Sequence, residues 1–218
     1  VLTIVGLLFN DPILKAIGVP SEVFSEASTY LSIYFWSLIF VMVYNMGSGI
    51  LRSVGDSKRP LYFLIFSSVV NIILDFLFVK YFHFGVAGAG YATLIAQAIS
   101  AIMVMYVLMK TEDDYKVVLK EIGFDKEILL KIIKIGLPTG FQQSIVSLSN
   151  VIVQSYINVY GASVIAGYSV TIKIDGFVNL PLQAFNMAIT TFVGQNIGAK
   201  QYDRVKKGAY ITTALATL

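Results

Sequence analysis

Two long stretches of the chain carry almost no charge, and they limit the folds that are open to it. Residues 31–44 contain no charged side chain, and residues 61–79 contain one, Asp75. A helix needs about 20 mostly apolar residues to cross the hydrocarbon core of a bilayer. The whole chain is 56% hydrophobic and 13% charged, with a mean hydropathy of +0.75, whereas about 25% of the residues of a soluble domain are charged. The chain is therefore predicted to be an all-α polytopic membrane protein.

Prolines, glycines and charge clusters divide the chain into a series of predicted helical spans. The end of one span is expected at residues 1–9, and a last span is entered at Ala209. Between them, spans are expected at residues 27–51, 61–79, 87–109, 129–159 and 164–197, the last of these interrupted by Pro181. Because both ends of the chain lie inside apolar stretches, the chain is predicted to be an internal fragment of a longer protein.

The lysines and arginines fall almost entirely in alternate loops between these spans. Thirteen lie on one side, two (Lys15 and Lys80) lie on the other, and Lys173 lies inside a span. Cytoplasmic loops carry the excess of basic residues in membrane proteins. The loops at 52–60, 110–134 and 198–208 are therefore predicted to be cytoplasmic in a multi-pass protein of the cell membrane. The formal charge of +3 follows from these loops, so the expected partner is the lipid bilayer and no nucleic acid.

The longest polar segment, residues 110–134, is predicted to be a cytoplasmic linker with an amphipathic surface helix. A linker at this point divides the chain into two helical bundles, as in transporters that are built from two related halves. The predicted parts are residues 1–110, a linker at 111–127, and residues 128–218.

Three charged residues fall inside predicted spans, where a charge near the bilayer centre costs roughly 2.5–3.5 kcal/mol on insertion scales. They are Asp75, Lys173 and Asp175. Asn71 precedes Asp75 by four residues, so both side chains project from one helical face. Their oxygens can share a Na⁺ ion, and burial can equally raise the pKa of the Asp75 carboxyl until it carries a proton. Thr93, early in the next span, offers a third oxygen.

Structural roles for these residues stay open. Asn71 and Asp75 can serve only as interhelical hydrogen-bonding groups, or Asp75 can reach the outer interface near Lys80. Lys173 and Asp175 are two residues apart and do not face each other on a regular helix, so pairing with other helices is at least as well supported as a role in transport.

The reactive residues that most enzymes need are scarce in this chain. It contains no cysteine and a single histidine, His83, which excludes thiol nucleophiles, disulfides and histidine metal clusters. The spans also lack a clustered acidic pair for general acid–base chemistry. The chain is predicted not to be an enzyme, to need no cofactor, and to bind no metal beyond Na⁺ at Asp75.

The predicted span at 129–159 carries a polar stripe that is expected to line a substrate cavity, with polar packing between helices as the alternative. Its residues are Gln142, Gln143, Ser147, Asn150 and Gln154. Pro138 and Pro181 each remove a helical hydrogen bond and favour a kink. Pro138 can instead begin a helix, because proline is well tolerated in the first turn.

Five segments, in order, resemble those of the multidrug and toxic compound extrusion (MATE) transporters. They are the loop at 50–60 (ILRSVGDSKRP), residues 71–75 (NIILD), 85–93 (GVAGAGYAT), 136–143 (GLP with the following QQ) and 193–199 (VGQNIGA). The resemblance implies a monomeric transporter of twelve helices in two six-helix lobes. This chain would run from the end of the third helix into the ninth.

The resemblance also implies a cation site in the first lobe. In family members with this site, the ligands are an Asp on the first helix, an Asn and an Asp on the fifth, and a small residue and a Thr on the sixth. The motifs place the last four at Asn71, Asp75, Ala89 and Thr93, and the first lies outside this chain. An acidic residue that often follows the Leu-Pro of the seventh helix is absent, since residues 144–147 read SIVS. The coupling role is therefore assigned to Asp75.

The expected function is secondary active efflux of an amphipathic, cationic compound in exchange for Na⁺ or H⁺. One alternative is a lipid-linked oligosaccharide flippase of related architecture. A flippase is expected to line its cavity with several basic residues, whereas the predicted spans contain only Lys173. A non-transporting membrane scaffold is the other alternative. The coupling ion and the identity of the small-molecule substrate stay open at this stage.

Overall fold

The computed structural model describes residues 2–17 and 19–217, which form helices joined by short turns. In chain order the elements are α1 (Leu2–Ile17), α2 (Ser21–Ser53), α3 (Lys58–Phe76), the π-helical turn η1 (Leu77–Tyr81), α4 (Gly85–Lys110), the 3-10 turn η2 (Leu119–Glu121), α5 (Lys126–Asn158), α6 (Ala162–Gly198) and α7 (Tyr202–Thr217). The chain forms two compact units, residues 1–118 and 119–218. The first unit ends inside the predicted linker.

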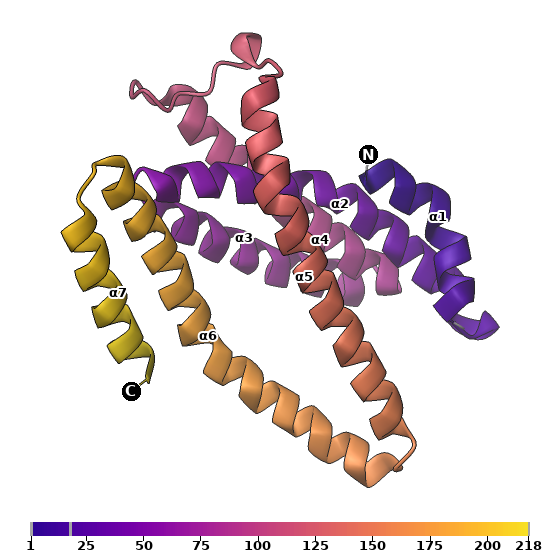
Figure 1. Cartoon of the computed structure of the whole chain (residues 1–218). Coiled ribbons are helices and arrows are strands. Elements are labelled where there is room, and N and C mark those ends of the chain that lie inside the picture. The colour runs from indigo at the N-terminus through magenta and orange to yellow at the C-terminus, as the bar shows by residue number, and fades with distance from the viewer. Residues whose placement is uncertain (1, 18, 218) are drawn as a thin grey trace. The chain divides into compact units, whose positions relative to one another are not determined.

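In the first unit, α2, α3 and α4 pack along one another and α1 packs on α2 (Figure 1). The central apolar cluster consists of Tyr44, Leu51, Phe63, Ala101, Val104 and Leu108. Close approach of α2 to α4 depends on Gly47, because a Cβ atom there would lie 2.9 Å from Val104 Cγ2 and 3.2 Å from Leu108 Cδ1. Interiors packed at this density have no room for the added carbon, so a small residue is required.

Three helices in the described part of the chain are long and apolar enough to cross a membrane. They are α2, the segment Lys58–Tyr81 (α3 with η1) and α4. They coincide with the predicted spans 27–51, 61–79 and 87–109 and confirm the polytopic all-α class. Helices α5 and α6 cover the predicted spans 129–159 and 164–197. Their polar side chains make them less apolar, and their crossing of the membrane stays a prediction.

The N-terminal helix is longer than the sequence predicts. A span was expected to end at Phe9, but α1 continues through Pro12 to Ile17. Asn10 explains the extension, because its Nδ2 donates to the Ser28 backbone oxygen (2.8 Å) and to Ser32 Oγ (2.6 Å) on α2. These tertiary hydrogen bonds hold the helix where the local sequence favours an end.

Both interior prolines of the second unit lie within continuous helices. The predicted interruption at Pro181 is wrong, since α6 runs unbroken from Ala162 to Gly198, and Figure 1 shows it changing direction partway along its length. Pro138 lies well inside α5, so the alternative in which it begins a helix is wrong too. A proline inside a helix removes one backbone hydrogen bond and bends the axis without ending the helix when the flanking residues keep their pairing.

The amphipathic surface helix that was predicted within residues 110–134 does not form. The described segment between α4 and α5 contains only the single 3-10 turn Leu119–Glu121. Helix α5 begins at Lys126 because Asp125 Oδ1 accepts hydrogen bonds from the N–H groups of Glu127 (2.9 Å) and Ile128 (3.0 Å). This N-cap starts one helix that runs directly into the predicted span.

Candidate functional site

Helix α3 carries Asn71 and Asp75 one turn apart, both partly buried. Asn71 Nδ2 and Asp75 Oδ1 are enclosed and have no hydrogen-bond partner. Among the described residues, such atoms otherwise occur only at Asn10 Oδ1 and Ser48 Oγ. An enclosed polar atom without a partner costs about 1–3 kcal/mol, and more when it is charged. Of these four atoms, only the one on Asp75 belongs to a carboxylate, so this position is the one that most requires an explanation.

The other two predicted ligands lie on the neighbouring helix. Ala89 and Thr93 belong to α4, which packs against α3, and both are partly buried. The four predicted residues therefore lie on two adjacent helices of one unit. Two residues after Asp75, the backbone changes to the π-helical turn η1, a distortion that is frequent at functional sites.

Neither structural alternative for Asp75 describes this arrangement. Asp75 Oδ1 and Asn71 Nδ2 do not form interhelical hydrogen bonds. Lys80 places its Nζ over the Phe76 ring, 4.6 Å from the ring centroid, which is a cation–π contact. Within the described ranges, the ion pair present is the one between Arg59 and Asp56.

The pair on α3 has the chemistry that a cation site needs. A carboxylate brings negative charge and hard oxygen ligands, which suit Na⁺ and a proton alike. Rotation of the Asn71 amide by half a turn exchanges its Oδ1 and Nδ2. Asn71 can therefore offer an oxygen to a metal ion or an N–H group to the Asp75 carboxylate.

The second unit contains a cavity of about 400 Å³ between α5 and α6. Its lining residues are Asn150, Val151, Gln154, Ser155, Tyr168 and Ile172. Two members of the predicted stripe thus line a cavity, whereas Gln142, Gln143 and Ser147 are exposed on α5 and lie outside the lining. The sequence analysis missed Tyr168 because nothing local marks a tyrosine of another helix as a neighbour of the stripe.

The charged pair inside α6 makes no mutual contact that would neutralise it. The side chains of Lys173 and Asp175 are both exposed in the second unit. Asn179 Nδ2 donates a hydrogen bond to the Asp175 backbone oxygen (2.8 Å), which leaves the carboxylate uninvolved. This geometry adds no support for a coupling role at either residue.

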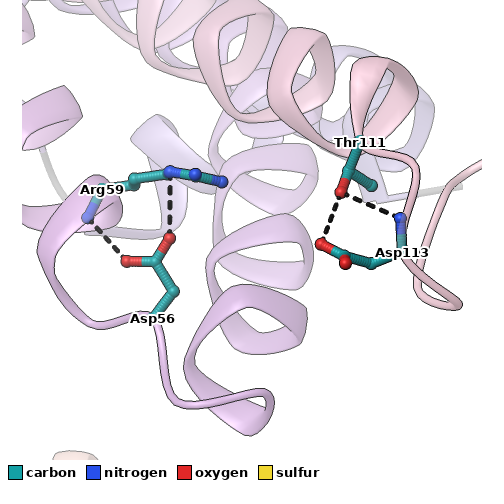
Figure 2. Close-up of polar contacts among 4 residues, drawn as sticks. All are labelled: Asp56, Arg59, Thr111 and Asp113. Carbon is teal, nitrogen blue, oxygen red and sulfur yellow. Dashed lines mark hydrogen bonds and ion pairs between the residues drawn. The ribbon is translucent and has the colours of Figure 1, made fainter.

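A larger cavity, about 910 Å³, opens at the turn between α2 and α3 in the first unit. Its lining residues are Val54, Asp56, Arg59, Glu112, Asp113, Asp114 and Tyr115. Figure 2 shows the two pairs that frame it: Asp56 with Arg59, and Thr111 with Asp113. Arg59 Nε lies 3.2 Å from Asp56 Oδ2, and the Arg59 N–H donates to Asp56 Oδ1 (3.1 Å).

Asp113 is held in its charged form by its neighbours. The Thr111 hydroxyl donates to Asp113 Oδ2 (2.8 Å). This hydrogen bond, a second one from Tyr115 and the positive charge of Arg59 hold the pKa of Asp113 below its usual range. The segment after α4 is thereby connected electrostatically to the turn between α2 and α3.

Comparison with known proteins places the whole chain. Residues 1–77 and 138–218 match the MatE family model. The probable multidrug resistance protein YoeA of Bacillus subtilis is 34% identical over 95% of this chain. The multidrug export protein MepA of Staphylococcus aureus is 26% identical over 90% of it. The structure of a MOP superfamily transporter from Pyrococcus furiosus superposes with a TM-score of 0.90 at 26% identity over 99% of this chain.

The chain spans about half the length of these proteins, covering 46% of YoeA, 44% of MepA and 48% of the Pyrococcus transporter. The family model includes α3 through Asp75 and the polar stripe of α5. The matched proteins are transporters, which agrees with the prediction that the chain is not part of an enzyme. The chain belongs to the MatE family, the multidrug and toxic compound extrusion transporters that its motifs resemble.

Proposed function

We propose that the full-length protein containing this chain exports an amphipathic, cationic compound from the cell in exchange for Na⁺ or H⁺ bound at Asp75. The observation that supports this proposal best is the enclosed, unpartnered Oδ1 of Asp75 on a helix that can span a membrane. A bound cation would remove the cost of burying that oxygen. The names of YoeA and MepA, a multidrug resistance and a multidrug export protein, support the class of substrate.

The proposed cation ligands are Asp75, Asn71 and Thr93, with Ala89 leaving room beside them. Coupling requires that the cation binds one arrangement of the protein more tightly than the other, because a ligand with equal affinity for both shifts nothing. The cation therefore has to change the contacts around α3 when it binds, and no soluble cofactor is needed.

The proposed substrate cavity is the one between α5 and α6. Asn150 and Gln154 provide hydrogen-bonding groups, and Tyr168 provides an aromatic face for a flat cation. None of the described residues that line it is basic, which favours a cationic compound over the diphosphate headgroup of a lipid-linked oligosaccharide.

The orientation that export requires places the loops at 52–60, 110–134 and 198–208 in the cytoplasm of a cell-membrane protein. The excess of Lys and Arg in these loops supports it. Single cysteines introduced at exposed positions of these loops, in a background free of other cysteines, should react with a membrane-impermeant maleimide only after the membrane is opened. Labelling of intact cells at any of them would reverse the orientation.

The deciding experiment is efflux of ethidium from vesicles that contain the full-length protein, with Na⁺ and H⁺ gradients imposed separately. We expect one gradient to drive efflux, and Asp75→Asn to abolish it, because the amide cannot supply the negative charge. Asp175→Asn is the matched control, since it removes an exposed carboxylate from another predicted span. It should keep at least half of the wild-type rate.

Two outcomes would contradict the proposal. Full gradient-driven efflux by Asp75→Asn would remove the coupling role from this residue. No gradient-dependent efflux by the wild-type protein would favour a lipid-type substrate or a non-transporting scaffold.

The cavity has its own test in the same vesicles. Tyr168→Ala should lower the apparent affinity for ethidium about tenfold, in line with the 0.5–2 kcal/mol of a cation–π contact. Tyr156→Ala, which removes a tyrosine that is 71% exposed and lies outside the cavity lining, should leave it unchanged. Equal effects of the two variants would exclude the cavity as the ethidium site.

A further inference from the structure

The segment that follows α4 folds back on the first unit. Helix α4 ends at Lys110, and the Val117 N–H donates a hydrogen bond to the Leu108 backbone oxygen at 2.9 Å. Between these points, the Lys116 N–H donates to the Asp113 backbone oxygen at 3.0 Å and closes a turn. The chain therefore reverses direction immediately after the helix and returns along its last turn.

Two side chains of this segment pack on the apolar core. Tyr115 and Val117 contact the cluster formed by α2, α3 and α4, whereas Asp114, Lys116 and Val118 are exposed. Alternate residues of an extended segment point to opposite sides, so one side of residues 115–117 faces the core and the other faces away. Burial of a tyrosine and a valine at a helix end stabilises this contact through the apolar area removed from solvent.

Polar contacts fix the start of the same segment. Thr111 Oγ1 donates to Asp113 Oδ2 (2.8 Å) and accepts from the Asp113 N–H (3.3 Å), which forms the closed ring of contacts in Figure 2. Asp113 and Tyr115 also line the 910 Å³ cavity together with Asp56 and Arg59. The segment thus reaches the turn between α2 and α3 as well as the end of α4.

We propose that residues 111–118 form a strap that is a fixed part of the first unit, with Tyr115 and Val117 as its anchors. The flexible connection to α5 then begins at Leu119, not at the end of α4, and extends only to Asp125, which caps α5. Division of the structure after Val118 supports this assignment. The predicted linker at 111–127 would consist of a docked part and a much shorter free tether.

The strap has a consequence for transport, and this part rests on the proposed function. Two lobes that move against each other during the cycle are restrained by the chain that joins them. A short tether limits the accessible arrangements of its ends, and release of the strap lengthens it. Variants that undock the strap should therefore slow coupled efflux while the cation site stays intact.

Amide hydrogen exchange in the full-length protein tests the strap directly. The Val117 amide should exchange at least about tenfold more slowly than that of Phe124, which is 98% exposed in the tether, after correction for intrinsic rates. Tenfold corresponds to about 1.4 kcal/mol for opening of the strap. Tyr115→Ala should accelerate the Val117 amide about tenfold and leave that of Phe124 unchanged.

Two further variants separate packing from polar contacts. Tyr115→Phe keeps the ring and should preserve most of the protection at Val117. Leu119→Ala, which truncates a side chain that is 54% exposed just beyond the strap, is the matched control and should change nothing. Equal exchange of Val117 and Phe124 in the wild-type protein would overturn the strap, and unchanged exchange of Val117 in Tyr115→Ala would overturn the anchor.

A second readout does not depend on the stability of the anchor variant. The chain contains no cysteine, so cysteines can be introduced singly as Val117→Cys and Leu119→Cys, in a background free of other cysteines. We expect slow maleimide labelling at position 117 and fast labelling at 119, and equal rates would overturn the proposal. Exchange and labelling need no efflux, so failure of the proposed transport function would be seen separately from failure of the strap.

Discussion

The turn between α2 and α3 and the turn between α6 and α7 end their first helices with the same backbone hydrogen bonds, but with different residues. In the first turn, the Asp56 N–H donates to the Leu51 oxygen (2.9 Å) and the Gly55 N–H to the Arg52 oxygen (3.0 Å). This is the Schellman arrangement, in which the residue after the helix cap adopts a left-handed conformation. Gly55 takes that position with φ +93°.

The second turn repeats the pattern without a glycine. The Gln201 N–H donates to the Asn196 oxygen (2.8 Å), and the Lys200 N–H donates to the Ile197 oxygen (2.9 Å). Lys200 takes the left-handed position with φ +57°. In this turn Arg204 Nη1 donates to Gln201 Oε1 (3.0 Å), where the first turn has the Arg59–Asp56 ion pair.

The difference shows that the hydrogen bonds define this turn, while the value of φ decides which residues can occupy it. A φ near +57° lies in the left-handed region that L-residues reach at moderate cost, whereas +93° lies beyond it and favours glycine. The first turn also lines the cavity beside the strap. Its glycine and aspartate therefore have fewer acceptable replacements than Lys200 and Gln201.

The largest effect is expected from Gly55→Val. A β-branched residue at φ +93° should destabilise the protein by about 1–3 kcal/mol, measured as a lower thermal midpoint of the purified full-length protein. Gly49→Ala is the control, because a Cβ atom at Gly49 meets nothing within 4 Å and alanine is the better helix former. A normal midpoint for Gly55→Val would mean that the turn relaxes to a different conformation.

Asp56→Ala should have the next largest effect. It removes the acceptor of the Arg59 N–H and one half of the ion pair, and loss of such a capping side chain costs about 1 kcal/mol. Gln201→Ala is the matched change in the other turn. There the lost contact is exposed and neutral on one side, so a few tenths of a kcal/mol are expected. Equal losses in thermal unfolding would erase the distinction between the two turns.

Lys200→Gly should act in the opposite direction. Glycine carries no penalty at positive φ, so the variant should be more stable by about 0.5–1 kcal/mol, less the greater chain entropy that glycine adds to the unfolded state. A raised thermal midpoint would confirm the strained lysine. A lowered one would show that the Lys200 side chain makes contacts worth more than the relief of strain.

The smallest effect concerns pH and the strap beside the first turn. The hydrogen bonds of Thr111 and Tyr115 and the charge of Arg59 lower the pKa of Asp113 in the folded protein. The stabilisation is present above the unfolded pKa, about 3.9, and is lost as pH falls through the lower folded value. Exchange of the Val117 amide, corrected for intrinsic rates, should therefore be independent of pH from 8 to 5 and accelerate only below about 4.

Two comparisons test this pH dependence. The other charged groups that face Asp113 across the cavity are Asp56, Glu112 and Asp114. Asp113→Asn should remove the acid dependence, whereas Asp114→Asn should keep it. Acceleration of exchange near neutral pH would assign the titration to another group.

The sequence by itself determined the class of the protein and the placement of Asn71 beside Asp75. Long apolar runs without charge permit few environments besides a bilayer, and a spacing of four residues within one helix is a local property. The same locality explains why the spans of α2, α3 and α4 were predicted within a few residues. Their length and hydropathy depend on neighbours in the chain alone.

Only the tertiary structure decided where the chain ignores its local signals. Helix α1 passes Phe9 because Asn10 bonds to α2, and α6 passes Pro181 without a break. Tyr168 becomes a neighbour of Gln154, and the polar linker begins as a strap docked through Tyr115. Each depends on contacts between residues distant in sequence, whose free energy outweighs weak local preferences and leaves no periodic pattern in the sequence.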